Sequence, residues 1–156
     1  MKKTKIINFF CYFIVCLLLV GCCEKEYAYP TGKDDILVFG DGRIAISKFA
    51  SDKWLILNRT DGAIDCLLQR VQSYKLLKGA LYVKSEEGYG IVDKDYSIRL
   101  FITIPAEEFV SGYSEDKEGN RTYHSRFVEN DHILYLNSFS DFSKKEQEIL
   151  TQLKIK

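Results

Sequence analysis

Short apolar runs separated by turn residues dominate the chain from position 35 to position 137, and this pattern predicts β-strands. Gly40-Asp41-Gly42 and Thr60-Asp61-Gly62 favour tight turns with positive φ, so each predicts a hairpin between the strands beside it. The predicted strands are 36–39, 43–47, 53–58, 63–69, 71–77, 80–84, 89–93, 97–104, 121–129 and 132–137. This series of hairpins predicts an antiparallel meander. Pro105 ends one of its apolar runs, and Asn130-Asp131 connects the last two predicted strands.

One amphipathic helix is predicted at the carboxyl terminus. Ser143 and Glu146 fit a capping box, and Ile149, Leu150 and Leu153 follow with the spacing of one helical face. A helix of about ten residues is marginal alone in water, so its apolar side must pack on the sheet. The expected fold class is α+β: a mainly antiparallel β-sheet with one face partly covered by a C-terminal helix.

The amino terminus has the layout of an export signal. Three lysines in the first five residues precede an apolar run from Ile6 to Val20, and Gly21 stands directly before Cys22. The run has about 15 residues and contains Asn8, whereas a helix needs about 20 apolar residues to span a bilayer. A permanent transmembrane anchor is therefore the weaker alternative.

The end of this segment, Leu19-Val20-Gly21-Cys22, resembles the lipobox of bacterial lipoprotein precursors at all four positions. The resemblance implies cleavage before Cys22, a diacylglycerol on its sulfur and an acyl chain on its new amino group, which together anchor the protein firmly in a membrane. Because Cys23 and not Asp follows, the resemblance favours the periplasmic face of the outer membrane in a Gram-negative host. The expected organisation is a signal peptide over 1–21, a lipidated tether over 22–34 and one β-rich domain over 35–156.

Charge and length then limit the classes of partner. The 156-residue chain has 22 basic and 22 acidic residues, and removal of the three signal lysines leaves 19 basic against 22 acidic. This mild acidity argues against a nucleic-acid partner, which needs a basic stripe to displace counterions from phosphates. The expected membrane contact is therefore the acylated Cys22 alone.

Few cysteines remain for other chemistry. Cys11 and Cys16 leave with the signal, and lipid occupies Cys22, so only Cys23 and Cys66 remain. Cys66 lies in an alternating apolar run, which favours a buried free thiol in the core; a disulfide with Cys23 is the alternative in an oxidising compartment. The cysteines form no CxxC spacing and the histidines lie elsewhere, so we expect no metal site.

Two segments form a weak internal repeat. Residues 53–59 and 88–94 share an aromatic residue, two apolar positions, an Asn or Asp and a basic residue, and they resemble WG-type hairpin repeats of bacterial proteins. Only two copies exist, the second has Tyr89 in place of Trp, and hairpins of one meander also look alike. A compact sheet is expected, because a solenoid normally needs at least three repeats.

Motifs for catalysis are missing from the sequence. It contains no GxSxG, HExxH, Walker or dinucleotide-binding motif. His124 and His132 are interpreted as strand-edge residues, and Glu86-Glu87 and Glu107-Glu108 as solvated carboxylates. We predict no catalytic residue, no cofactor and no enzymatic activity.

The segment from 107 to 118 is the candidate recognition site. It is acidic, with Lys117 as its one basic residue, and it falls in a predicted long connection; such loops are functional or disordered. A solvated loop is one interpretation, and a docking surface that steers a basic partner is the other. The segment also contains Tyr113, and tyrosine is enriched at protein interfaces. The predicted partner-binding residues are Glu107, Glu108, Tyr113, Glu115, Asp116 and Glu118.

These patterns together favour a protein-binding lipoprotein of the cell envelope. The small, mildly acidic β-rich chain, ending in residues 137–143 and a short helix, is similar to small immunity proteins of bacterial toxin systems. That similarity implies neutralisation of a toxin in the periplasm. The alternatives are a structural or assembly lipoprotein of the envelope, and a hydrolase whose site the sequence does not reveal.

Overall fold

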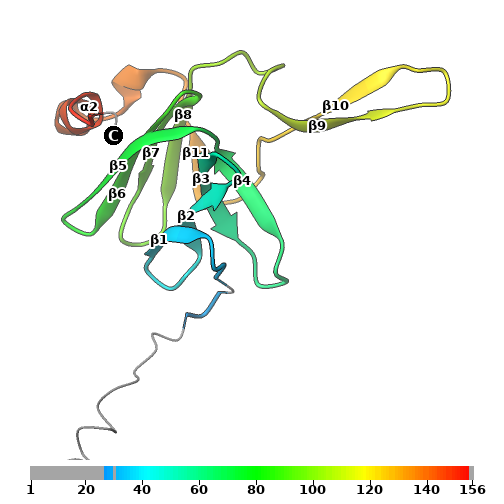
Figure 1. Cartoon of the computed structure of the whole chain (residues 1–156). Coiled ribbons are helices and arrows are strands. Elements are labelled where there is room, and N and C mark those ends of the chain that lie inside the picture. Colours follow the sequence, from blue (N-terminus) through cyan, green and yellow to red (C-terminus); the bar gives the residue numbers. More distant parts are fainter. Residues whose placement is uncertain (1–26, 30, 155–156) are drawn as a thin grey trace, which may run out of the picture.

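The structure is a computed structural model that describes residues 27–29 and 31–154. The predicted signal segment, the lipobox, Cys22 and Cys23 lie outside these residues. The elements, labelled in Figure 1, are β1 (Asp35–Phe39), β2 (Ile44–Phe49), β3 (Asp52–Asn58), β4 (Ile64–Leu68), β5 (Val71–Leu77), β6 (Ala80–Ser85), β7 (Gly88–Val92), β8 (Ile98–Ile102), β9 (Val110–Glu115), β10 (Arg121–Ser125), β11 (Ile133–Tyr135), the 3-10 helix η1 (Phe139–Asp141) and α2 (Lys144–Thr151).

The strands form two main sheets instead of one. The first is the antiparallel meander β1-β2-β3-β4, and the second has the order β11-β8-β7-β6-β5. The chain passes from one sheet to the other between Leu68 and Val71, where Arg70 has a φ of 49°. The predicted hairpins at Gly40-Asp41-Gly42 and Thr60-Asp61-Gly62 are confirmed, and these glycines have positive φ. The expected fold class, α+β and mainly antiparallel, is confirmed as well.

The last strand differs from the predicted meander, because β11 pairs in parallel with β8. The connection from β10 returns to the end of the sheet at which β8 begins, where the amide of Ile98 donates to the carbonyl O of His132 (2.7 Å). A strand that enters at this end must run in the same direction as β8. Asn130-Asp131 therefore does not join two hairpin strands, and the expected strand 132–137 is reduced to Ile133–Tyr135.

The core lies between the two sheets. Alternate residues of strands in both sheets face inward, for example Leu55 and Leu57 of β3 and Leu81 and Val83 of β6. The buried side chains of this core are Phe39, Ile44, Ile46, Leu55, Leu57, Leu67, Leu68, Val71, Leu81, Val83, Val92, Ile98 and Leu100. Both segments of the proposed repeat, 53–59 and 88–94, contain a strand that lies between two antiparallel neighbours, β3 and β7.

Helix α2 covers the outer face of the second sheet, as predicted. Ile91 of this face packs with Phe142, Leu150 and Leu153. The predicted capping box is also present, because the Ser143 hydroxyl accepts from the amide of Glu146 and the Glu146 carboxylate accepts from the amide of Ser143. The outer face of the first sheet has no such helix among the described residues, so the two sheets differ in what covers them.

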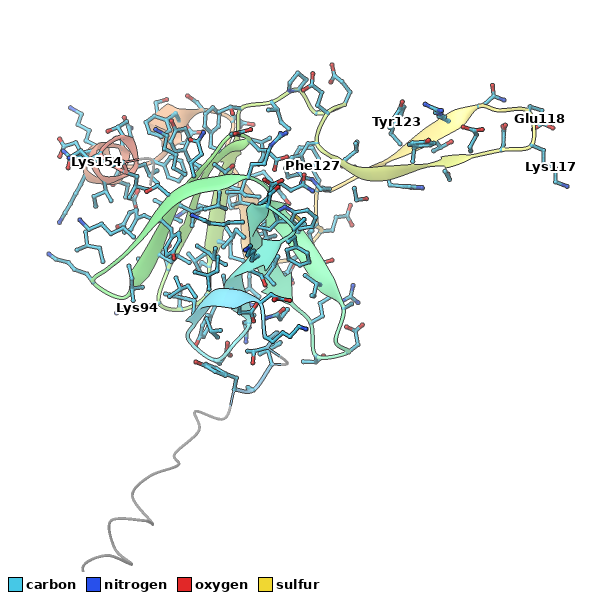
Figure 2. All side chains as sticks on the ribbon, viewed as in Figure 1. Lys94, Lys117, Glu118, Tyr123, Phe127 and Lys154 are labelled. Carbon is cyan, nitrogen blue, oxygen red and sulfur yellow. The ribbon has the colours of Figure 1, made fainter. Side chains whose placement is uncertain are left out.

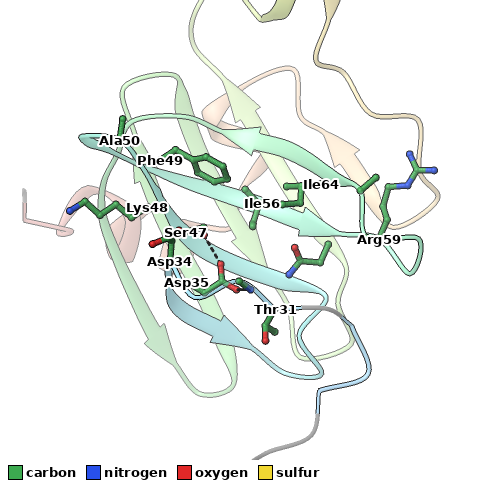
Figure 3. A pocket seen from close by; sticks show the side chains of 14 residues that line it. Thr31, Asp34, Asp35, Ser47, Lys48, Phe49, Ala50, Ile56, Arg59 and Ile64 are labelled. Carbon is green, nitrogen blue, oxygen red and sulfur yellow. Dashed lines mark hydrogen bonds between the residues drawn. The ribbon is translucent and has the colours of Figure 1, made fainter.

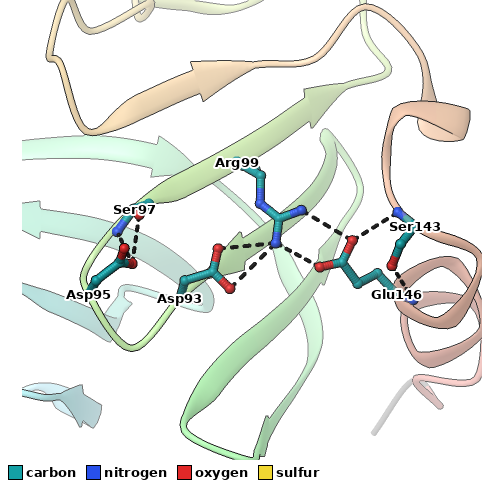
Figure 4. Close-up of polar contacts among 6 residues, drawn as sticks. All are labelled: Asp93, Asp95, Ser97, Arg99, Ser143 and Glu146. Atoms are coloured by element: carbon teal, nitrogen blue, oxygen red, sulfur yellow. Dashed lines mark hydrogen bonds and ion pairs between the residues drawn. The ribbon is translucent and has the colours of Figure 1, made fainter.

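An ion-pair network joins the helix to the sheet. The Arg99 guanidinium on β8 lies 2.7 Å from the Glu146 carboxylate and 3.1 Å from the Asp93 carboxylate (Figure 4). The hydrogen bonds from Arg99 lower the pKa of Glu146 to about 2, with a further contribution from Ser143. Because Arg99 lies on the sheet and Glu146 lies on the helix, the network fixes the position of α2 on the sheet.

Candidate functional site

The acidic segment predicted to be a loop is half of a projecting hairpin. β9 and β10 pair in antiparallel fashion and extend away from the two sheets (Figure 1). Apart from Val110, every residue of the two strands is exposed, so both faces of this ribbon, here called the arm, lie in solvent. The expectation of an irregular connection is wrong, because a strand exposed on both faces lacks the apolar alternation that reveals a strand in sequence.

The arm ends in a turn built by one of the predicted binding residues. The Asp116 carboxylate accepts from the amides of Glu118 (3.0 Å) and Asn120 (2.8 Å), and from the Asn120 side chain. These hydrogen bonds, led by that of the Asn120 side chain, lower the pKa of Asp116. Glu115 pairs with Arg121 across the strands (3.0 Å). Two of the predicted acidic contacts therefore have partners within the arm.

The six predicted binding residues do not form one patch. Glu107 and Glu108 lie in the exposed turn that precedes β9, at the base of the arm, whereas Glu118 lies at the far tip beside Lys117 (Figure 2). Because Glu118 has a basic neighbour and Glu115 is paired, the tip carries little net negative charge. A docking surface on the arm must therefore depend on groups other than a continuous row of carboxylates.

Two tyrosines supply such a group. Tyr113 and Tyr123 lie directly opposite each other, with ring centroids 5.8 Å apart, and are 49% and 59% exposed. The Arg121 guanidinium lies over the Tyr113 ring, 4.5 Å from its centroid. This aromatic and cationic surface is of the kind that dominates protein interfaces, where Tyr, Trp and Arg contribute most of the binding energy. Tyr123 was absent from the predicted set, although its alternation with Arg121 points both to one face.

The base of the arm is part of the folded body. Phe109 is fully buried, its ring lies 4.9 Å from that of Phe127, and the Phe127 ring lies 4.9 Å from that of Tyr135. The amide of Arg126 donates to the carbonyl O of Phe109 (2.9 Å), which continues the strand pairing inward. An isolated two-stranded hairpin is marginally stable in water, so this buried base is what orients the arm.

A buried ion pair between Arg126 and Glu87 stabilises the base of the arm. Arg126 and Glu87 each have side chains only 3% exposed, and Nη2 lies 2.6 Å from Oε2. The carboxylate also accepts from the amide of Gln69 (2.7 Å), and the guanidinium lies over the Phe109 ring at 4.2 Å. The prediction that Glu86-Glu87 is a solvated pair is therefore wrong for Glu87. The β6–β7 turn places it against the arm, and no local pattern links two residues so far apart in sequence.

Cys66 lies beside the Arg126–Glu87 ion pair and not in the core. It faces outward from the first sheet, opposite Ile56, and is half-buried. Nη1 of Arg126 lies 3.6 Å from its sulfur, and burial raises the pKa of the thiol to about 11. The thiol is therefore protonated at neutral pH and weakly reactive. Cys23 is outside the described residues, so a disulfide between the two remains a prediction.

The two histidines lie in different parts of the structure and do not share a site. His124 is exposed on the arm, and His132 lines a cavity of about 580 Å³ together with Arg43 and Tyr96. A second cavity, of about 460 Å³, lies on the outer face of the first sheet (Figure 3). There the Ser47 hydroxyl donates to Asp35 with no histidine in the lining. Within the described part of the chain, no group of three or more His, Cys, Asp or Glu side chains is arranged to hold a metal ion.

Comparison of the chain with protein-family models, with curated proteins and with solved structures gives no match. Among residues 27–29 and 31–154, no helix is long and apolar enough to cross a membrane.

Proposed function

We propose that the mature protein is a lipid-anchored protein of the cell envelope that binds another protein through its β9–β10 arm. The lipobox Leu19-Val20-Gly21-Cys22 supports the proposed location in the cell envelope, because acyl chains on Cys22 would hold the domain at a membrane. The observation that carries the binding role is the arm itself: a ribbon exposed on both faces whose base is fixed by a buried ion pair.

A fixed arm is suited to binding for an energetic reason. Association costs free energy when flexible segments must become ordered, and a preorganised segment avoids most of that cost. The tip then presents Tyr113 and Tyr123 as large side chains with few rotatable bonds, while Arg121 is already held on a ring. Aromatic contact with this face, supported by hydrogen bonds to the exposed strand edges, is the proposed binding mode.

The proposed partner is a toxin that reaches the periplasm, which makes the chain an immunity protein. Support comes from the resemblance of the small, mildly acidic β-rich chain to immunity proteins, together with an arm that projects from the two sheets (Figure 1). A toxin gene directly upstream would strengthen this assignment. Its product should be inhibited by the mature domain and should escape inhibition by arm variants.

The arm is tested by comparing captured partners. The full mature lipoprotein, a Tyr113→Ser/Tyr123→Ser variant and a Leu134→Ser control are used to capture proteins from envelope extracts, with quantitative mass spectrometry as the readout. Leu134 on β11 is 57% exposed, close to the 59% of Tyr123, so the control removes one comparably exposed apolar side chain from the body. The wild type and the control should retain a partner that the arm variant loses. Identical capture by all three proteins would contradict the proposed function.

The proposed lipid anchor at Cys22 is tested separately by the intact mass of the native protein. Cleavage before Cys22 and acylation should give a mature chain that begins at this residue and carries the added lipid. The Cys22→Ser variant should keep its leading segment and gain no lipid. A wild-type protein with an unmodified thiol at position 22 would contradict the proposed location without affecting the arm experiment.

A further inference from the structure

A groove of about 500 Å³ lies between the edge strand β4 and the base of the arm. Trp54, Ile64, Cys66 and Gln69 line it from the first sheet and its β4–β5 corner, and Ser125 and Phe127 are among the residues that line it from the arm side. Ile64 and Phe127 are both large apolar side chains exposed to solvent. Exposed apolar side chains on a groove of this size offer a place for an apolar side chain of a ligand.

The β4 edge offers backbone hydrogen bonds beside this groove. In the described part of the chain, β4 pairs only with β3, so the backbone groups on its other side have no strand partner. Native edge strands are usually protected by lysine, proline or a covering element. β4, with the sequence Ile-Asp-Cys-Leu-Leu, contains neither lysine nor proline, and Asp65 is its one charged residue. A free edge with so little protection can accept an extended peptide as an additional strand.

Two buried donors of the groove-lining residues also have no acceptor. Among the described residues, neither Nε1 of Trp54 nor Nε of Arg126 has a hydrogen-bond partner. Arg126 is nearly fully buried and its charge is balanced by Glu87, while Asp65 adds a negative charge to the groove. A neutral acceptor therefore fits these donors better than an anion does, and the carbonyl oxygen of a peptide is such an acceptor.

We propose that this groove binds an extended polypeptide segment of a partner, which adds to the sheet at the free edge of β4. One apolar side chain of the segment lies between Ile64 and Phe127, and its carbonyl groups accept from Trp54 and Arg126. This binding mode goes beyond the proposed function, since it involves neither Tyr113 nor Tyr123. It can hold whether or not the tip of the arm binds a protein.

The probe for the test is a phage-displayed library of random linear peptides, selected on the mature lipoprotein in detergent micelles. Enriched peptides should slow hydrogen exchange at the backbone amides of residues 64–68. Trp54→Phe keeps an aromatic ring against Phe49 but removes the Nε1 donor, and it should weaken binding about fivefold or more. Ile64→Lys, at a site that is already exposed, should abolish binding without unfolding the domain.

Matched controls distinguish the groove from the arm. Leu76→Lys on β5, at a side chain 55% exposed against 51% for Ile64, lies outside the groove and should leave peptide affinity unchanged. Tyr123→Ser should also leave it unchanged. A selection that enriches no peptide, peptides insensitive to Ile64→Lys, or unchanged exchange at 64–68 would each overturn the proposal. Peptides that respond to Tyr123→Ser but not to Ile64→Lys would overturn the groove and support binding at the arm.

Discussion

The stability of the arm base depends on the charge of Glu87. Replacement by Gln keeps the shape of the side chain but leaves the Arg126 guanidinium, 3% exposed, without a counter-charge. Arg70, whose Nη2 lies 3.8 Å from Oε1 of Glu87, is itself largely exposed and adds another positive charge nearby. The variant therefore creates an uncompensated buried cation and also weakens the bond that Glu87 accepts from the amide of Gln69.

The expected loss is large compared with the total stability of a domain. Removal of one partner from a buried ion pair typically costs about 3–5 kcal/mol, whereas the free energy of unfolding of most domains is about 5–15 kcal/mol. Glu86→Gln is the matched control, because the neighbouring Glu86 carboxylate is 52% exposed and pairs with Arg70 on the surface. An exposed pair contributes about 0–1 kcal/mol, so this control should unfold almost as the wild type does.

Urea unfolding measures both variants, and fluorescence of Trp54, the only tryptophan, is a probe close to the arm base. Equal midpoints for Glu87→Gln and Glu86→Gln would refute the argument that a buried charge is left unpaired. The double variant Glu87→Leu/Arg126→Met supplies a second test, since replacement of both charges by apolar groups of similar volume is often neutral or stabilising. Its free energy of unfolding should exceed that of Glu87→Gln.

Three further predictions concern the helix, a turn and the base of the arm. Glu146→Gln should lower the free energy of unfolding by about 1.5–3 kcal/mol at neutral pH, because it weakens the hydrogen bonds from Arg99. Since the folded pKa of Glu146 is lowered from 4.5 to about 2, the difference from wild type should be full above pH 4.5 and should shrink as the pH falls towards 2; a difference independent of pH would contradict this. Gly88→Ala should cost at least about 2 kcal/mol in thermal or urea unfolding, because Gly88 has a φ of 151° and a Cβ there collides with the carbonyl O of Phe101; wild-type stability would show that the backbone can relax. Phe109→Ala should cost about 3–5 kcal/mol and make the arm more sensitive to limited proteolysis, and an unchanged cleavage pattern would show that the arm is oriented without this ring.

Local signals in the sequence were sufficient for much of the fold. The hairpin at Gly40-Asp41-Gly42 follows from residues that tolerate positive φ, and the α2 boundary follows from the Ser143 and Glu146 cap. The burial of Leu150 and Leu153 follows from their spacing on one helical face. In each case the residues that determine the structure are close neighbours in the chain, so the pattern can be recognised without knowledge of the fold.

Local sequence patterns predicted only part of the candidate site. The segment 107–118 was identified by its charge and by Tyr113, and a strand was expected over 121–129, but the pairing of the two as one projecting hairpin was not predicted. Charge in the sequence also did not show that Glu115 and Asp116 are engaged within the arm. A strand that is exposed on both faces and stabilised at its base carries no periodic apolar signal of its own.

The sequence by itself therefore determined the capped helix, the two hairpin turns and most strands of the two sheets, because each depends on residues close together in the chain. The lipobox at Cys22 is a local pattern of the same kind and stays a prediction. Only the tertiary structure decided the division into two sheets, the parallel pairing of β11 and the burial of Glu87 against Arg126. These features join segments that are distant in sequence. Their free energy depends on which surfaces meet when the chain collapses, and that information is not present in any single stretch of residues.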